Sequence, residues 1–326
     1  MTRASQTQRR SVQKARAALE PLRLGLCCQF AEEEIRFRTA TAAALSRLSA
    51  AARAERLAEI CRQNVESLQA ALRFCAESGI GAFRVNSQFL PVKTHPDVGY
   101  EVTALPGGEA IIQKLRECGE FAREHSIRLT FHPDQYVVLN SPRPEVVARA
   151  VADLAAHAEL AEWIGADVIN IHGGGAYGDP DSALATLAAN IKRLPNSIRE
   201  MLTLENDDCV FTPTQLLPVC HATGVPLVYD VHHHRCLPDA MSVEEATTAA
   251  AATWNREPVV HISSPLSGWD GPHPRRHHDY IAPEDFPDCW LGRKLTIDVE
   301  AKAKELAVLR LADGLRARLG QGVAAR

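Results

Sequence analysis

The chain has 326 residues, of which 46% are hydrophobic and 6% aromatic, and it carries a formal net charge of −4 at pH 7. No apolar run approaches the roughly 18 residues that a membrane-spanning helix needs, and no signal-peptide core opens the chain, so we expect a soluble, cytoplasmic protein without a membrane partner. The negative total argues weakly against a nucleic-acid partner, because domains that bind nucleic acid are usually basic.

Positive charge is concentrated at the start of the chain. Residues 1–23 carry six arginine or lysine residues against the single acidic residue Glu20. The first dozen residues also lack a hydrophobic pattern, so we expect residues 1–20 to form a basic, disordered arm. Its arginine-rich, acid-poor composition would also suit a transit peptide. Residues 21–320 are long enough for two average domains, but α/β barrels of this size often form one.

Eight short segments rich in β-forming residues predict β-strands. They cover residues 22–28, 82–85, 127–131, 167–171, 201–204, 227–229, 259–262 and 295–299. Helical patterns lie between them, at residues 41–78 (broken in two), 109–125, 144–163, 182–193, 214–223, 242–254 and 301–319. Pro144 in a first turn and Gly165 after a last turn mark the two ends of one of these helices.

Strands that alternate with helices in this way are typical of a (β/α)8 barrel. The competing doubly wound sheet would need a glycine-rich phosphate loop after the first strand, and the sequence LGLCCQF at residues 24–30 does not contain one. We therefore predict a single (β/α)8 TIM barrel, with its functional site at the C-terminal ends of the strands, the mouth of the barrel.

Six successive strands of this barrel end in an acidic residue or a histidine. These residues are His132, His172, Glu205, Asp230, His261 and Glu300. Any one of them could be an ordinary core or surface residue, but an acid or imidazole at six consecutive strand ends is hard to obtain by chance. Imidazole and carboxylate ligands that converge on one point suit divalent metal ions. Three further histidines can join from loops: His95, His233 and His277.

Other chemistry has less support in the sequence. His125, His157 and His221 fall in helical patterns, where packing and surface roles are more common. Asp298 lies two residues before Glu300 and one layer deeper, which makes it a spare candidate ligand. No GxSxG motif occurs, and the nine cysteines form no CxxC pair, so neither a nucleophilic triad nor a thiolate zinc site is expected.

Several motifs together resemble the UV damage endonuclease family. They are FRVNSQFLP followed by His95-Pro96, SIRLTFHPDQYVVLNSP, NIHGGGAYGD, LTLEND, VYDVHHH, VHIS, HHDYI and DVEAKAKEL, and they follow the family's order from about Leu24 to Leu306. The combination of HPDQY, LEND and VEAKxKE is specific. That family resembles endonuclease IV in fold: a barrel whose mouth holds up to three divalent ions and nicks DNA on the 5′ side of a damaged nucleotide.

The resemblance implies a set of metal ligands, and every position matches in residue type. The set is His95, His132, His172, Glu205, Asp230, His233, His261, His277 and Glu300. Within it, the resemblance implies catalytic roles for Glu205, Glu300 and His233, with the two glutamates bridging ions. We expect Mn²⁺, with Zn²⁺ or Co²⁺ as alternatives, because sites of imidazole and carboxylate suit several metals.

The resemblance also implies contacts with damaged DNA. Gln135 and Tyr136 match the family's lesion-probing glutamine and tyrosine. Leu26 and Phe30 stand where family members place a tyrosine and an asparagine, which puts the lesion preference in doubt. Val259 stands where a lysine can occur in the family.

Basic residues near the expected mouth are candidate phosphate contacts. They are Arg275 and Arg276, together with Arg84, Lys93 and Arg235, although each alone is more often a solvated surface charge. Three carboxylates balanced by up to three dications would leave the mouth positive, which would attract a phosphodiester despite the chain's negative total.

We therefore expect a metal-dependent endonuclease that nicks damaged double-stranded DNA 5′ to UV photoproducts, leaving a 3′ hydroxyl and a 5′ phosphate. It would use no nucleotide cofactor and act as a monomer. The alternative enzyme class is a xylose-isomerase-like sugar isomerase or epimerase, whose single ion would suit Glu205, Asp230, His261 and Glu300 but would leave the other histidines without a task. A barrel that binds damaged DNA without cutting it would need a broken ligand set, and no ligand is visibly lost.

Overall fold

The structure is a computed structural model that describes residues 19–324. The predicted basic arm, residues 1–20, therefore lies outside the described residues except for its last two. None of the helices in the described part of the chain is long and apolar enough to cross a membrane.

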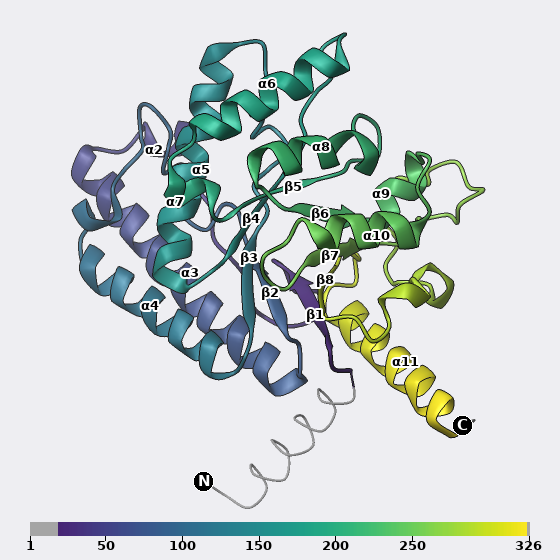
Figure 1. The fold of residues 1–326 in the computed structure, drawn as a ribbon. Helices are drawn as coiled ribbons and strands as arrows, with labels where there is room; N and C mark the ends of the chain where they lie inside the picture. The colour runs from purple at the N-terminus through teal and green to yellow at the C-terminus, as the bar shows by residue number, and fades with distance from the viewer. Residues whose placement is uncertain (1–18, 325–326) are drawn as a thin grey trace, which may run out of the picture.

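Eight parallel strands close into a barrel in chain order (Figure 1). They are β1 (Leu22–Cys27), β2 (Ala82–Val85), β3 (Arg128–Phe131), β4 (Val168–His172), β5 (Leu202–Glu205), β6 (Leu227–Asp230), β7 (Val259–Ile262) and β8 (Leu295–Val299). The barrel closes where β1 pairs with β8, in a register that runs from Leu22 opposite Leu295 to Leu26 opposite Val299. The predicted barrel is confirmed, and each predicted strand agrees with an observed one to within one residue at either end.

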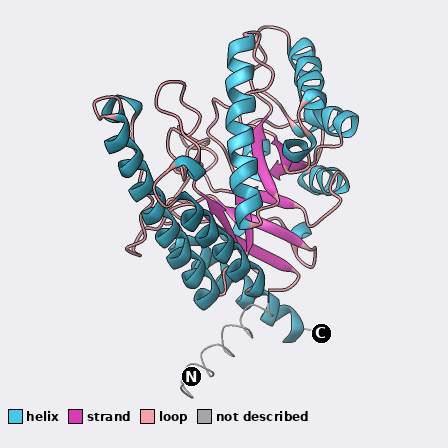
Figure 2. Cartoon of the chain, turned by 90° about the vertical axis from the view of Figure 1, so that its left-hand side faces the viewer, coloured by secondary structure: helices cyan, strands magenta, loops and turns pink. Residues whose placement is uncertain are grey.

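Helices enclose the strands, as Figure 2 shows from the side. They are α2 (Ala42–Leu45), α3 (Ala50–Ser78), α4 (Gly108–Glu124), α5 (Pro144–Ile164), α6 (Pro180–Arg193), α7 (Asn196–Arg199), α8 (Pro213–Thr223), α9 (Val231–Cys236), α10 (Val243–Ala252) and α11 (Glu305–Ala324). The predicted break within residues 41–78 is confirmed. Ser49 begins α3 by accepting a hydrogen bond from the Ala52 N–H, and Gly79 ends it with a left-handed φ of 75°.

The short helices α7 and α9 were not predicted from the sequence. The histidine-rich stretch after β6 forms α9, because the Asp230 side chain accepts a hydrogen bond from the His233 N–H and so caps a helix at its first turn. This helix decides which of the three consecutive histidines can face the barrel axis.

The two ends of the barrel differ in chemistry. At the N-terminal ends of the strands, Glu257 accepts hydrogen bonds from Arg23 on β1, at 2.9 Å, and from Thr296 on β8, at 2.5 Å. Val168, Val228 and Val259, each the first or second residue of its strand, pack into a buried apolar cluster. The candidate ligands lie at the opposite ends of the same strands, so the network of ion pairs and the candidate site occupy separate ends of the barrel.

Candidate metal centre

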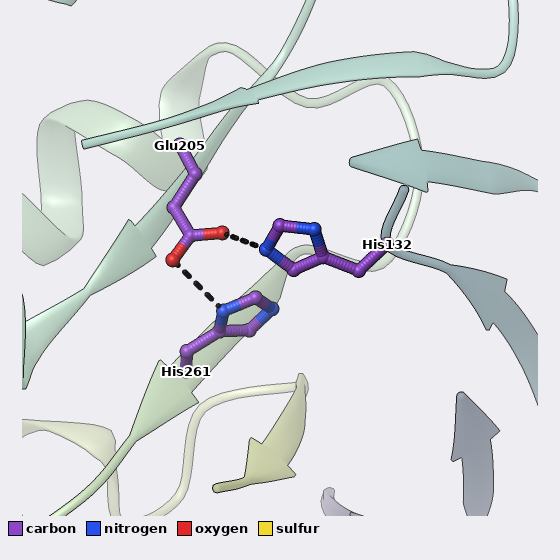
Figure 3. Close-up of side chains that lie close together, drawn as sticks. All are labelled: His132, Glu205 and His261. Carbon is purple, nitrogen blue, oxygen red and sulfur yellow. Dashed lines mark ion pairs between the residues drawn. The ribbon is translucent and has the colours of Figure 1, made fainter. Parts of the chain in front are cut away.

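Glu205 is the centre of the candidate site. It ends β5 and is fully buried. Its Oε2 atom lies 2.9 Å from His132 Nε2, and its Oε1 atom lies 3.2 Å from both His261 Nδ1 and His233 Nδ1. Figure 3 shows His132 and His261 reaching the two oxygens from different strands. One carboxylate therefore connects imidazoles from three elements of the barrel.

Seven of the nine predicted ligands fall into three groups whose ligand atoms lie within 4.8 Å of one another. The groups are His132, Glu205 and His261; His172, Glu205 and His233; and Asp230, His261 and Glu300. Glu205 and His261 each belong to two groups. Shared ligands of this kind are what neighbouring divalent ions would require, since each ion then borrows part of its coordination from a bridging residue.

Local hydrogen bonds orient the histidines toward the carboxylates. His132 Nδ1 donates to the Pro133 carbonyl at 3.0 Å, so the ring turns Nε2 toward Glu205. His233 Nδ1 donates to the Asn206 carbonyl at 2.9 Å, which leaves its Nε2 atom free to coordinate. Asn206 also exchanges hydrogen bonds with the backbone of Asp230, at 2.9 and 3.0 Å, and so ties the end of β5 to the end of β6.

Three buried polar atoms at this site lack a hydrogen-bond partner among the described residues. Glu205 Oε1, Asp230 Oδ2 and His261 Nδ1 make no hydrogen bond of acceptable geometry with any described residue. A buried polar group without a partner is costly, by about 1 to 3 kcal/mol. Divalent cations held by the ligand groups to which these residues belong would satisfy the three atoms, and the donor set of oxygen and imidazole nitrogen fits such ions.

The electrostatics of the site point the same way. Burial by itself raises the pKa of Glu205. The neighbouring imidazoles, His261 foremost, lower it by more than burial raises it, so the pKa lies well below its usual value. Burial lowers the pKa of His233, but the carboxylates of Asp230 and Glu205 raise it well above the usual range. The pKa of His172 is lowered, chiefly by burial. The Glu205 carboxylate thus stays ionised and attracts positive charge into the site.

The two remaining predicted ligands lie at the edge. His277 Nδ1 is 3.8 Å from Glu300 Oε2, and its side chain is half-buried. His95, in the loop after β2, belongs to none of the three groups, and its Nδ1 atom accepts a hydrogen bond from the Asp97 N–H at 3.1 Å. It lines a cavity of about 510 Å³ that Tyr136 also lines.

The three consecutive histidines after β6 have different environments. His233 faces Glu205, whereas His234 contacts the Tyr229 hydroxyl at 2.8 Å and is a buried structural residue. His232 is buried, and its ring packs 5.2 Å from the ring of His277. The sequence analysis singled out His233 as a candidate ligand but assigned no role to His232 or His234, whose directions follow from the helical turn that Asp230 begins.

The predicted lesion-probing residues are exposed. Gln135 and Tyr136 lie in the loop after β3, and 65% of the Tyr136 surface is accessible. The Tyr136 hydroxyl donates to Asp134 Oδ2 at 3.0 Å. Leu26 and Phe30, in contrast, are buried in the hydrophobic core. Leu26 and Phe30 are therefore packing residues in this chain.

The candidate phosphate contacts divide into two kinds. Arg275 and Arg276 are exposed, and Arg275 Nε lies 3.7 Å from Asp208 Oδ2 in an ion pair at the surface. Arg84 is buried, with hydrogen bonds to two carboxylates inside the barrel, and its prediction as a solvated or phosphate-binding charge is wrong. Lys93 is buried between two glutamates, and Arg235 is held by Asp285 at 3.4 Å, so neither is a free surface charge.

One residue that contacts the site was missed, and the role of a second was misinterpreted. Asn170 on β4 donates a hydrogen bond to Glu205 Oε2, and Arg84 lies 3.0 Å from His261 Nε2. Asn170 stands two residues before His172, so strand alternation could have placed it on the same face. The position of Arg84 carried no such signal, because its partners come from strands more than 170 residues away.

A closed barrel of parallel strands, with overlapping groups of imidazole and carboxylate ligands at its mouth, defines a (β/α)8 protein with a candidate multinuclear metal centre. The chain belongs to the UV-endonuclease UvdE family, whose model matches residues 22–321. The family predicted from the sequence motifs is thereby confirmed.

Known proteins agree with this assignment. The chain is 38% identical over 301 residues to the UV DNA damage endonuclease of Deinococcus radiodurans, in a match that covers 88% of this chain and 94% of that protein. The crystal structure of SacUVDE matches with a TM-score of 0.81 and 29% identity, over 91% of this chain and 98% of the other. Endonuclease IV from Thermus thermophilus shares the fold alone, with a TM-score of 0.59 and 16% identity over 92% of this chain and 99% of the other.

Proposed function

We propose that this chain is a metal-dependent DNA repair endonuclease that nicks the backbone of damaged double-stranded DNA 5′ to UV photoproducts. The observation that carries the proposal is the set of three overlapping ligand groups around the buried Glu205, in a chain of the UV-endonuclease family. The homologue in Deinococcus radiodurans is named a UV DNA damage endonuclease, which supports the same reaction here. The enzyme would act in the cytoplasm, as a monomer and without a nucleotide cofactor.

The ligands would be the nine residues inferred from the sequence, which would hold up to three ions. They are His95, His132, His172, Glu205, Asp230, His233, His261, His277 and Glu300. Mn²⁺ is the proposed metal, with Zn²⁺ and Co²⁺ as alternatives. Bound ions of this kind would activate water for attack on phosphorus and neutralise charge on the departing oxygen.

The residues of the chain would divide the remaining work. Glu205 and Glu300, the carboxylates of adjoining ligand groups, would bridge ions and fix their spacing. His233, oriented by the Asn206 carbonyl, would keep its Nε2 lone pair toward the reacting centre. Their burial would exclude bulk water, which strengthens each electrostatic interaction with a phosphate.

The surface around the mouth would position the duplex. Gln135 and Tyr136 are exposed on the loop after β3, where an amide and an aromatic ring can replace lost base pairing and stacking. Arg275 and Arg276 would contact backbone phosphates, which fixes the register of the duplex without reading its sequence. The net positive charge of a metal-loaded mouth would attract the phosphodiester, although the whole chain is acidic.

The isomerase alternative accounts for fewer of the residues. A single ion could use Glu205, Asp230, His261 and Glu300. The last three form one ligand group, and His261 also shares a group with Glu205. His132, His172 and His233 would then have no ion to bind, although they complete the two ligand groups that contain Glu205. Membership of the UV-endonuclease family also favours the nuclease.

Incision of three 5′-labelled duplexes tests the proposal. One duplex carries a single UV photoproduct, one an abasic site and one no damage, and each is incubated with the full chain and Mn²⁺. The expected result is a nick immediately 5′ to the photoproduct, with a 3′ hydroxyl on the labelled fragment and little cutting of undamaged DNA. Equal cutting of all three duplexes, or none of the photoproduct duplex, would contradict the proposal.

A further inference from the structure

Asp298 is a buried carboxylate that lies directly below the candidate ligands. It stands on β8 two residues before Glu300, and only 1% of its surface is exposed. Its Oδ2 atom accepts a hydrogen bond from Arg84 Nε at 3.0 Å. Its Oδ1 atom is buried and has no hydrogen-bond partner among the residues that the structure describes. Asp298 belongs to none of the three ligand groups, so its earlier interpretation as a spare ligand gains no support.

The barrel leaves a space for this carboxylate. Gly25 on β1 pairs with Asp298 on β8 in the strand register. A Cβ atom built on Gly25 would collide with Asp298 Oδ1, so any residue larger than glycine would displace the carboxylate. The glycine in the first strand is therefore explained by the close approach of an acidic side chain.

Arg84 connects this carboxylate to two of the candidate ligands. Its guanidinium donates from Nε to Asp298 and from Nη1 to Glu300 Oε1, at 3.0 and 2.6 Å. Its Nη2 atom lies 3.0 Å from His261 Nε2. The planar guanidinium has several donors in a fixed geometry, so one side chain sets the relative positions of three others.

The two nitrogens of His261 face different neighbours. Nδ1 points to the ligand groups, 3.2 Å from Glu205 Oε1 and 3.4 Å from Glu300 Oε1. Nε2 points to Arg84 and lies 3.7 Å from Asp298 Oδ2. A separation of 3.7 Å is too long for a hydrogen bond, so Arg84, rather than Asp298, is the group in direct contact with Nε2.

We propose that Asp298 is a positioning residue of the metal centre, which holds the Arg84 guanidinium in place against Glu300 and His261. Arg84 balances the negative charge of Asp298 and holds it beside Glu300, so that His261 and Glu300 reach the ion in a fixed relative geometry. The inference rests on the proposed metal-dependent function.

The competing explanation is a buried ion pair that only stabilises the barrel, and the chain contains a matched control for it. Arg128 on β3 has a side chain as buried as that of Arg84, each with 10% of its surface exposed. It forms a bidentate pair with Asp167, at 2.9 and 2.8 Å, away from the candidate ligands. Arg128→Met therefore reports the cost of losing a buried arginine and its ion pair, here with the more exposed Asp167, without touching the metal centre.

The test compares binding of Mn²⁺ with stability in the full-length, metal-free chain. The variants are Asp298→Asn, Arg84→Met, Arg84→Lys, Gly25→Ala and the control Arg128→Met. Mn²⁺ affinity is measured by calorimetric titration, bound metal by elemental analysis, and stability by urea unfolding without metal. We expect Asp298→Asn and Arg84→Met to weaken Mn²⁺ binding by about 10- to 100-fold, as loss of a residue that orients a ligand usually does.

The other variants separate position from charge. Arg84→Lys keeps the charge but cannot bridge three groups, so its loss of Mn²⁺ affinity should be smaller than that of Arg84→Met. Gly25→Ala changes no ionisable group and should weaken Mn²⁺ binding by displacing Asp298, which keeps the test informative if Arg84→Met does not fold. Arg128→Met should lose stability but bind Mn²⁺ as the parent does.

Two results would overturn the inference, and they are distinguishable. Parental Mn²⁺ affinity in Asp298→Asn and Gly25→Ala, with a loss of stability like that of Arg128→Met, would show that Asp298 serves the fold alone. Absence of Mn²⁺ binding by the parent chain itself would overturn the proposed metal-dependent function, and this inference with it.

Discussion

Asn170 donates its side-chain amide hydrogen to Glu205 Oε2, across the paired strands β4 and β5. The orientation of the amide is fixed, because Asn170 Oδ1 accepts a hydrogen bond from the Thr203 hydroxyl at 2.9 Å. Oε2 is thus held by Asn170 and His132, while Oε1 stays without a hydrogen bond from the described residues. The arrangement fixes the carboxylate and leaves one oxygen for a cation.

Replacement of Glu205 by glutamine tests the centre of the site. Glu205→Gln removes a charge that two ligand groups share, so bound metal should fall and single-turnover incision should slow by orders of magnitude. Metal content by elemental analysis and incision of a photoproduct duplex measure these effects, with circular dichroism as a check of folding. Near-normal turnover would show that the carboxylate at the end of β5 is not a ligand.

Loss of Asn170 should release the carboxylate without removing its charge. We expect Asn170→Ala to destabilise the protein by about 1 to 3 kcal/mol, because a buried donor to a charged group is lost. Metal affinity should fall by about 10- to 100-fold, as for other residues that orient a ligand. Thr203→Val is the matched control, since it removes only the hydrogen bond that fixes the amide and should have a smaller effect on both measurements.

Removal of metal should abolish nicking. The candidate site consists of imidazole and carboxylate groups, and its buried unpartnered atoms would hold a cation. We expect incision to stop in excess EDTA and to return when Mn²⁺ is added after the chelator has been removed. Elemental analysis must first establish that the treated protein is metal-free. Full activity of such a metal-free sample would contradict the metal-dependent mechanism.

Glu257, at the opposite end of the barrel, should make stability depend on pH. Burial by itself raises the pKa of Glu257. Hydrogen bonds from Arg23 and Thr296 lower it by more than this, so the pKa in the folded state lies below the unfolded value of about 4.3. Such a group stabilises the fold above the unfolded pKa, and this contribution is lost as pH falls through the folded pKa. Glu257→Gln should therefore be less stable than the parent at pH 7, by about 1 to 3 kcal/mol.

The difference between Glu257→Gln and the parent should narrow as pH falls below about 4.3, because the parent carboxylate then takes up a proton as well. Urea unfolding at neutral pH and at about pH 3.5, just below that unfolded value, measures the two differences, with metal left out of both. The same difference at both pH values would show that the charge of Glu257 is not the source of its stabilisation.

Strand ends were predictable from the sequence, whereas contacts between strands were not. Glu205 and Asp230 could be placed because each follows an apolar run, and parallel strands bring their C-terminal ends together. Arg84 was misinterpreted because a single charged residue in a short strand resembles a surface residue until its partners on β8 are known. The role of Gly25 depends on the same register, which no local pattern contains.

The consecutive histidines after β6 show a second limit. His232, His233 and His234 have the same side chain, and the sequence singled out only His233 as a candidate ligand and gave no place to the other two. Their separate directions follow from α9, which begins because Asp230 can cap a helix. His95 and Tyr136 show a third limit, since long loops position them and strand periodicity has no bearing on loops.

The last prediction concerns how damage is detected. A duplex must be distorted before its phosphate reaches a buried site, and lesions lower the cost of unstacking. Gln135 and Tyr136 are exposed beside the mouth, whereas Leu26 and Phe30 are buried and unavailable to DNA. Tyr136 should therefore carry much of the discrimination in this chain. We expect the double change Gln135→Ala and Tyr136→Ala to weaken incision of a photoproduct duplex far more than it changes metal content or thermal stability.

Tyr177 is the matched control for this double change, because it is the other exposed tyrosine among the described residues and lies on the neighbouring loop after β4, with 52% of its surface accessible. Single-turnover incision of the photoproduct duplex, with bound metal measured on the same samples, compares Tyr177→Ala with the double variant. A general loss of exposed aromatic surface would slow both proteins equally, whereas a specific probe would slow only the double variant. Parental incision by the double variant would show that damage is read elsewhere on the surface.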